Sequence, residues 1–129
     1  MPNANPASIF HLGRSTELFA ALNALRADAD PAVARAILDV RGKGLMVAVE
    51  FASPMGTGAY DRFADPAVPA KLASRVAARC VEKGMLILTT SVYEVVRFIP
   101  PLNISKEDLA KGVQIFEEAV REVVKEGKA

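Results

Sequence analysis

One charged residue, Arg97, lies within an otherwise apolar stretch of the sequence. The segment SVYEVVRFIPPLNIS, residues 91–105, is rich in β-branched and aromatic residues and contains a double proline, which predicts a strand followed by a helix start. Arg97 lies in the middle of this apolar run. A buried guanidinium is costly unless it meets a carboxylate or another strongly polar group. Arg97 is therefore the candidate anion-binding residue of the chain.

Two interpretations of Arg97 remain open from the residues alone. Strand alternation places its side chain on the same face as Val95 and Ile99. It could form an internal ion pair with Asp39 or Glu50 of a second predicted strand pair. It could equally lie at the edge of a cleft, where the guanidinium fork would bind both oxygens of an anionic substrate. Composition and spacing favour neither interpretation.

The other reactive side chains have structural explanations. His11 is the single histidine, and a metal site needs several converging ligands, so we expect no metal site. Cys80, the single cysteine, lies on the apolar side of a predicted helix, which favours a buried, reduced core thiol over a nucleophile. The RGKG segment, residues 41–44, leads into a strand and so fits a hairpin turn better than a phosphate-binding loop. We assign no catalytic residue.

Length and charge exclude several classes of protein. A chain of 129 residues is long enough for one domain. Sixteen basic and fifteen acidic residues give a net charge of +1, so neither a nucleic-acid nor a membrane partner is expected. A single cysteine fits a reducing compartment, and the N-terminus has no signal-peptide pattern, which predicts a cytoplasmic location.

Periodicity predicts the elements that position these residues. The chain is predicted to begin with a helix, a short helical turn and a glycine-containing hairpin. A second helix, a second strand pair and a C-terminal helix capped by Ser105 follow. The predicted ranges are 15–28, 30–36, 37–52, 67–83, 85–90, 94–100 and 105 onward. This order indicates an α+β fold, a two-layer sandwich whose mainly antiparallel sheet of two strand pairs carries its helices on one face.

Hydrophobic residues make up 51% of the chain, which is high for a small domain. The strand segments LMVAV and MLIL lack the polar alternation of strands that face water on one side. We therefore expect an apolar patch on the sheet face opposite the helices, with Arg97 at or near it. Such a patch predicts self-association or a covering partner domain.

Three stretches together resemble a known family. They are DVRGKGLMVAVEF, ARCVEKGMLILTTSVYEVVRFIPPLNIS and KEDLAKGVQIFEEAV, in this order. Residues 13–129 resemble the C-terminal small domain of class III pyridoxal-phosphate-dependent aminotransferases, most closely the 4-aminobutyrate aminotransferase branch. The leader, residues 1–12, matches poorly. The resemblance implies the small-domain fold of these enzymes, which are cytoplasmic or mitochondrial.

The resemblance implies a role for Arg97. In the family the arginine of the R-x-x-P-P-L strand binds the α-carboxylate of the amino-acid or keto-acid substrate, and Arg97 matches it. Family members often carry asparagine just before this strand, where the chain has Glu94. A carboxylate three residues from Arg97 is expected to alter the choice of substrate.

The resemblance also implies what this segment lacks. The family's Schiff-base lysine, the acid that contacts the pyridine nitrogen and the phosphate-binding turns belong to the large domain. No lysine of this chain has a matching context, neither Lys43, Lys71, Lys83, Lys106, Lys111, Lys125 nor Lys128. The isolated chain is therefore expected to hold no pyridoxal phosphate and to be inactive alone, as an excised or truncated domain. The alternative is a free-standing protein-interaction or small-anion-binding module.

Overall fold

The computed structural model describes residues 6–43, 46–54, 65–85, 87–89, 94–100 and 103–127, and the side chains of all these except 6–15 and 43. The elements alternate between helices and strand pairs, as the sequence predicts. They are α1 (Pro6–Arg26), α2 (Pro31–Ala36), β1 (Ile37–Lys43), β2 (Met46–Phe51), α3 (Leu72–Glu82), β3 (Leu88–Thr89), β4 (Val95–Phe98) and α4 (Lys106–Glu126).

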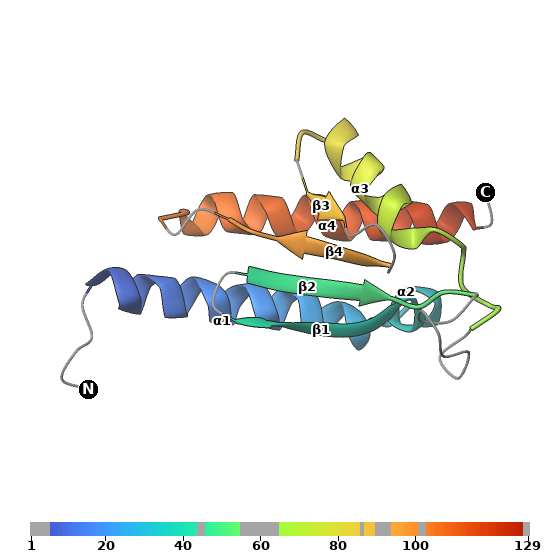
Figure 1. Cartoon of the computed structure of the whole chain (residues 1–129), viewed down its shortest axis with the longest axis horizontal. Helices are drawn as coiled ribbons and strands as arrows, with labels where there is room; N and C mark the ends of the chain where they lie inside the picture. Colours follow the sequence, from blue (N-terminus) through green and yellow to red (C-terminus); the bar gives the residue numbers. More distant parts are fainter. Residues whose placement is uncertain are drawn as a thin grey trace.

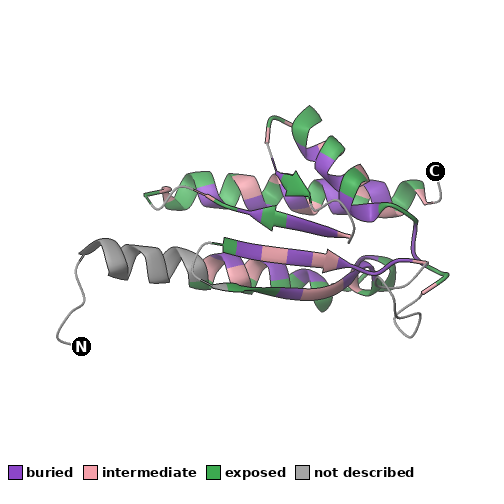
Figure 2. Cartoon of the chain, viewed as in Figure 1, coloured by how far each residue is buried: buried purple, intermediate pink, exposed green. Residues whose placement is uncertain are grey.

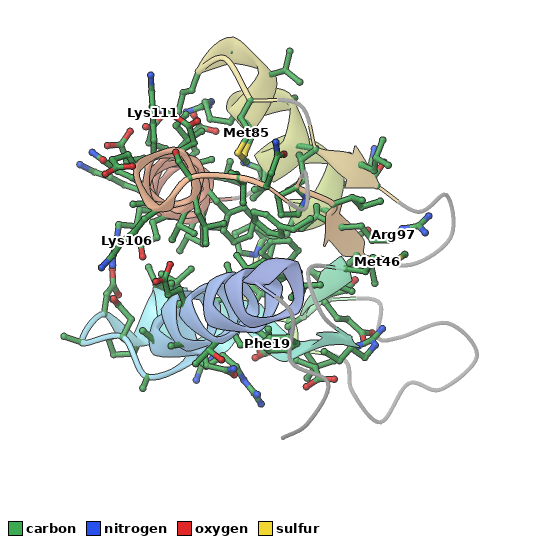
Figure 3. All side chains as sticks on the ribbon, turned by 90° about the vertical axis from the view of Figure 1, so that its left-hand side faces the viewer. Phe19, Met46, Met85, Arg97, Lys106 and Lys111 are labelled. Carbon is green, nitrogen blue, oxygen red and sulfur yellow. The ribbon has the colours of Figure 1, made fainter. Side chains whose placement is uncertain are left out.

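The strands form one antiparallel sheet with the order β1-β2-β4-β3. Strands β2 and β4 therefore lie at its centre, although α3 and β3 separate them in sequence. In Figure 1, α1 runs behind β1 and β2, and α4 runs behind β4. Figure 3 shows the same two layers end-on, with the strands on one side and α1 and α4 on the other. The predicted α+β sandwich with helices on one face is confirmed.

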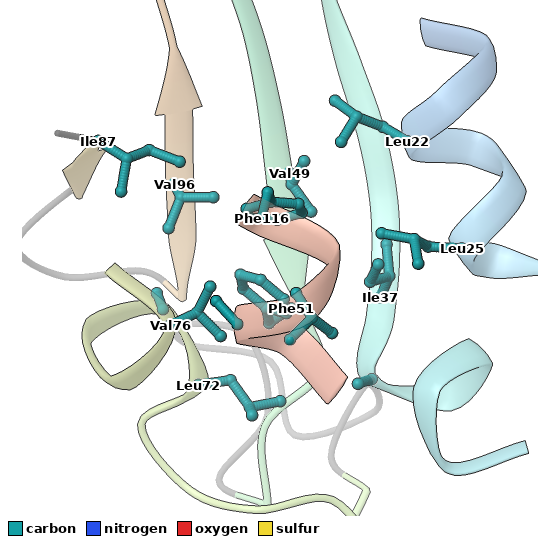
Figure 4. Close-up of a cluster of buried hydrophobic side chains, with 14 of the residues drawn as sticks. Leu22, Leu25, Ile37, Val49, Phe51, Leu72, Val76, Ile87, Val96 and Phe116 are labelled. Carbon is teal, nitrogen blue, oxygen red and sulfur yellow. The ribbon is translucent and has the colours of Figure 1, made fainter. Parts of the chain in front are cut away.

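The core lies between the sheet and the helices. In β2 every second residue is buried, so that Val47, Val49 and Phe51 face the helices. Phe116 of α4 lies among them, and its ring meets the Phe98 ring edge-on with the centroids 4.8 Å apart. Figure 4 shows this cluster, and Figure 2 shows buried residues alternating with less buried ones along the strands and helices. This alternation decides which strand residues are left for the outer face of the sheet.

Two helices begin elsewhere than the sequence predicts. The helix expected at Ser15 already begins at Pro6, a residue whose fixed φ suits a first helical turn. It therefore continues into the unmatched leader and includes the backbone of His11. The helix expected from residue 67 begins only at Leu72, because Pro69 disfavours helical backbone before it and Lys71 adopts a left-handed conformation with φ 57°.

Other sequence predictions concern single residues. The hairpin of β1 and β2 contains Gly42 at φ 155°, where an added Cβ would lie 2.1 Å from the Met46 carbonyl oxygen, while Gly44 lies outside the described residues. Cys80 is fully buried and free, and burial raises the pKa of its thiol to about 11. The buried thiol predicted from the helix pattern is confirmed. No helix in the described part of the chain has the length and apolar character needed to cross a bilayer.

Ion pairs join α3 to α4. Basic residues of α3 and of its C-cap are spaced four apart, and so are the acidic residues of α4 that they meet in antiparallel order. The Arg79 guanidinium lies 2.7 Å from Glu122 and also contacts Glu126, while the Lys83 ammonium lies 2.6 Å from Glu122. These ion pairs lower the pKa of Glu122 below its ordinary value, chiefly through the Lys83 hydrogen bond. They connect successive turns of α3 and α4.

Candidate anion-binding site on the outer face of the sheet

Arg97 lies in a row of residues that crosses the sheet. Arg41 of β1 pairs with Ala48 of β2, Ala48 pairs with Arg97 of β4, and Arg97 pairs with Leu88 of β3. Paired residues point to the same face, so all four side chains belong to the face away from the helices. Figure 3 shows Arg97 and Met46 on this outer side of the strands.

Arg97 is exposed rather than buried. Its side chain does not enter the core, although apolar residues flank it in sequence. Val96 and Phe98 supply the buried side of β4, while Arg97 and Ile99 point outward. The cost of desolvating the charge is therefore avoided, and the exposed guanidinium has no ion pair with any side chain in the described ranges.

The two acids considered as partners of Arg97 are bound by another arginine. The Arg41 guanidinium nitrogen Nη1 donates to Glu50 at 2.7 Å and to Asp39 at 3.2 Å. The Glu50 hydrogen bond is the main reason why the pKa of Arg41 is raised above its ordinary value. Arg26 of α1 also approaches Asp39, at 3.8 Å. The internal ion pair of Arg97 with Asp39 or Glu50 is thus not formed.

Hollows on two sides of Arg97 are lined by residues that the structure describes. The one on the outer face, of about 320 Å³, lies between Arg41 and Arg97 and is lined by Met46, Ala48 and Ile99 among others. The second, of about 250 Å³, lies at the end of β4 beside α4 and has mostly apolar walls, including Met85, Ile87, Phe98, Ile99, Leu109 and Val113. Arg97 supplies the cationic group shared by both hollows, so it can place a charge at the edge of an apolar surface.

Exposed apolar side chains surround the arginine. Met46, Leu88 and Ile99 are 59%, 47% and 51% exposed and lie on β2, on β3 and at the end of β4. The β1 side of the same face carries the Asp39, Arg41 and Glu50 ion pairs instead. The outer face is therefore apolar around Arg97 and charged toward β1, rather than apolar throughout as the strand sequences suggested.

Glu94 does not belong to this face. Its carboxylate oxygen Oε1 accepts a hydrogen bond from the Ala73 backbone amide at 2.9 Å, at the N-terminus of α3. The residue before the helix, Lys71, makes no side-chain cap, since an ammonium group has no acceptor. Glu94 therefore caps α3 from a distant part of the chain. Its expected influence on substrate choice, which assumed a position beside Arg97, finds no geometric support.

The lysine side chains that the structure describes are all exposed or half-buried. A nucleophilic lysine needs a lowered pKa, but the pKa of Lys83 is raised, chiefly by its hydrogen bond to Glu122. Lys71, Lys106, Lys111 and Lys125 are exposed, and the last three lie on α4, behind the sheet. Within the described ranges no group of histidine, cysteine and acidic residues could hold a metal ion. The His11 side chain lies outside the described residues.

The fold and the row of residues around Arg97 can be compared with known proteins. The class-III aminotransferase family profile matches residues 14–120. The chain belongs to this family, whose members depend on pyridoxal phosphate.

Several curated relatives are similar in sequence. A 4-aminobutyrate aminotransferase of Mycobacterium leprae is 38% identical over 60% of this chain, a 5-aminovalerate aminotransferase of Pseudomonas aeruginosa 37% over 69%, and an acetylornithine aminotransferase of Clostridium acetobutylicum 33% over 67%. The chain spans only 16%, 19% and 18% of their lengths.

Solved structures share the fold. An N-acetylornithine aminotransferase from Stenotrophomonas maltophilia superimposes with a TM-score of 0.71 at 20% identity, over 95% of this chain and 28% of the other. A lysine aminotransferase from M. tuberculosis gives a TM-score of 0.69 at 20% identity, over 91% of this chain and 22% of the other. At this identity the likeness concerns the fold alone.

Proposed function

We propose that the chain is the substrate-carboxylate-binding small domain of a class III aminotransferase, of the kind that acts on 4-aminobutyrate and related amino acids. The observation that carries the proposal is the exposed Arg97 guanidinium. It has no ion pair within the described ranges, and it borders one hollow on the outer face of the sheet and a second, mostly apolar one at the end of β4 beside α4. A bidentate guanidinium–carboxylate contact would hold one end of the substrate, and the hollows would accommodate its methylene groups.

The transamination reaction itself would take place in another domain. Pyridoxal phosphate supplies the electron sink for transamination, and the described lysines do not fit its attachment. The contribution of this chain would be to bind and orient the substrate carboxylate. We therefore expect the isolated chain to bind carboxylates weakly and to lack both an aldimine absorbance band and transaminase activity.

The test is a titration followed by NMR on the arginine Nε–H signals of the full 129-residue chain. Adding 4-aminobutyrate should shift the Arg97 signal with a dissociation constant of roughly 1 mM or weaker, since few contacts are available. The amide of the same compound, which keeps the ammonium group but lacks the carboxylate, should leave it unmoved. The ligand should also shift the backbone amide signals of β4 in the wild type, and an Arg97→Met variant, which lacks the Nε–H reporter, should abolish these shifts. A shift that persists in this variant, or an equal response to the amide, would contradict the proposal.

The exposed apolar residues of the same face support a second proposal, namely that this face is covered in the working protein. We propose that Met46, Leu88 and Ile99 are covered in the working protein by a large cofactor-binding domain. The alternative is that the face covers itself by self-association, as in a free-standing interaction module. Sedimentation at micromolar concentration distinguishes the two, because a monomer favours a separate covering domain. A dimer that is lost in a Leu88→Lys variant would favour self-association.

A further inference from the structure

We propose that Arg41 is a positioning residue for the carboxylate site. By binding Glu50 and Asp39, Arg41 would keep Glu50 away from Arg97 and so leave the Arg97 guanidinium available to a ligand. This inference rests on the proposed carboxylate-binding role of Arg97. It explains why an arginine with an acidic residue close by on the same face has no partner among the described residues.

The strand register places Glu50 within reach of both arginines. Arg41 and Arg97 pair with Ala48 from opposite sides, so that Ala48 lies between them. Glu50 follows Ala48 by two residues on the same face of β2. It is therefore the diagonal neighbour of each arginine, at a separation of roughly 7–8 Å that long side chains span. By position alone, Glu50 has two possible cationic partners.

The structure resolves this choice in favour of Arg41. The Glu50 side chain is only 16% exposed, so its carboxylate depends on a cation to compensate for lost hydration. Arg41 supplies that cation at 2.7 Å, and its bond to Asp39 at 3.2 Å holds the guanidinium on this side of the sheet. Arg26, 3.8 Å from Asp39, extends the same network.

Without Arg41, Arg97 would be the cation nearest to Glu50 by register. An acid fixed on the neighbouring strand competes with a free ligand as an intramolecular partner, which gives it a large advantage in effective concentration. Among the described side chains of the outer face, the charges of Asp39, Arg41, Glu50 and Arg97 would also change from balanced to net negative. Both changes weaken the binding of an anion at Arg97.

The positions of Asp39 and Glu50 also predict which of these acids can compete with a ligand for Arg97. Asp39 pairs with Glu50 from β1 and so lies two strands away from Arg97. Because neighbouring strands are about 4.8 Å apart, the Asp39 side chain starts roughly 10 Å from the Arg97 strand. Glu50 should therefore be the competitor, and Asp39 should act only through its bond to Arg41.

The test uses the full chain and 4-aminobutyrate as the probe, with the Arg97 Nε–H signal as the readout. Arg41→Met should weaken binding at least about tenfold, and Arg41→Gln, a second neutral variant, should do the same. Adding Glu50→Gln to Arg41→Met should restore the affinity to within about twofold of the wild type. Adding Asp39→Asn instead should not. Unchanged binding in both single variants, or a double variant with Glu50→Gln that remains weak, would overturn the inference.

A second readout keeps this test independent of the proposed function. In Arg41→Met, a new Arg97–Glu50 ion pair should slow the exchange of the Arg97 Nε–H with water, and Glu50→Gln should reverse this. This exchange needs no ligand. If the wild-type chain does not bind 4-aminobutyrate, the proposed function fails, while slowed exchange would still support the role of Arg41. Fast exchange in Arg41→Met, by contrast, would refute that role even where the ligand binds.

Discussion

Replacing Glu94 tests whether this residue stabilises the fold by capping α3 or influences ligand binding at Arg97. The Glu94 carboxylate accepts a hydrogen bond from the Ala73 backbone amide at 2.9 Å. It caps α3 because Lys71, the residue before the helix, has no acceptor group in its side chain. Ala73 is buried, so its amide would not regain a full water shell if the carboxylate were removed. We therefore expect Glu94→Ala to destabilise the fold while leaving the outer face of the sheet unchanged.

The magnitude follows from the hydrogen bond and the negative charge that Glu94→Ala removes from the start of α3. Losing an N-cap side chain costs about 0.5–2 kcal/mol, and a carboxylate at a helix N-terminus contributes about 0.3–1 kcal/mol through the helix dipole. Glu94→Ala should therefore lower the free energy of unfolding by about 1–2 kcal/mol. Glu94→Gln keeps an acceptor oxygen and should cost only about 0.3–1 kcal/mol. For a domain of this size, 1 kcal/mol corresponds to a shift in melting temperature of roughly 4 °C.

Urea unfolding with a matched control measures this effect. Ser105→Ala removes the cap of α4, where the Ser105 hydroxyl accepts the Asp108 amide at 3.1 Å, and should cost about 1 kcal/mol. Hydrogen exchange of the Ala73 amide should accelerate in Glu94→Ala and not in Ser105→Ala. The reasoning is refuted if Glu94→Ala leaves stability and Ala73 exchange unchanged, or if it alters 4-aminobutyrate binding at Arg97.

Three further predictions concern the core, the hairpin and the helix pair. Cys80, buried and with its pKa raised to about 11, should react with a thiol reagent far more slowly in the native than in the urea-unfolded chain; equal rates would contradict its burial. Gly42→Ala should destabilise the hairpin by more than about 1 kcal/mol in urea unfolding, because of the clash with the Met46 carbonyl, whereas Ala48→Gly on the outer face should cost about 1 kcal/mol or less. The lowered pKa of Glu122 means that its ion pairs stabilise the fold above pH about 4.5 and are lost below it. Melting temperature followed from pH 7 to 3 should therefore fall less steeply in Glu122→Gln, and an unchanged slope would argue against the ion pairs.

Local sequence rules predict the parts of the fold whose cause is local. The cap of α4 is an example, because Ser105 and Asp108 are three residues apart and their bond forms as expected. The start of α3 is a counterexample. Its capping carboxylate belongs to Glu94, 21 residues from Ala73, so no spacing pattern reveals it. The strand order β1-β2-β4-β3 likewise depends on the pairing of β2 with β4 across a helix.

The site shows the same limit. The sequence identifies Arg97 as exceptional, and strand alternation correctly sets it on the face opposite Val96 and Phe98, but it leaves open whether Arg97 pairs with Asp39 or Glu50 or lies at the edge of a cleft. The partner of Glu50 is equally hidden. Register makes Arg41 and Arg97 equivalent neighbours of that acid, and only packed side chains decide between them.

The apolar residues around Arg97 and its proposed role depend on each other. An arginine–carboxylate contact open to water contributes little, commonly about 0–1 kcal/mol, because water competes for both charges and screens them. The same contact is stronger once water is excluded, since the effective dielectric constant falls. Met46, Leu88 and Ile99, exposed in this chain, are the kind of surface that a covering domain would bury. Covering that surface would therefore both remove its apolar exposure and turn Arg97 from a weak surface cation into a selective carboxylate-binding group.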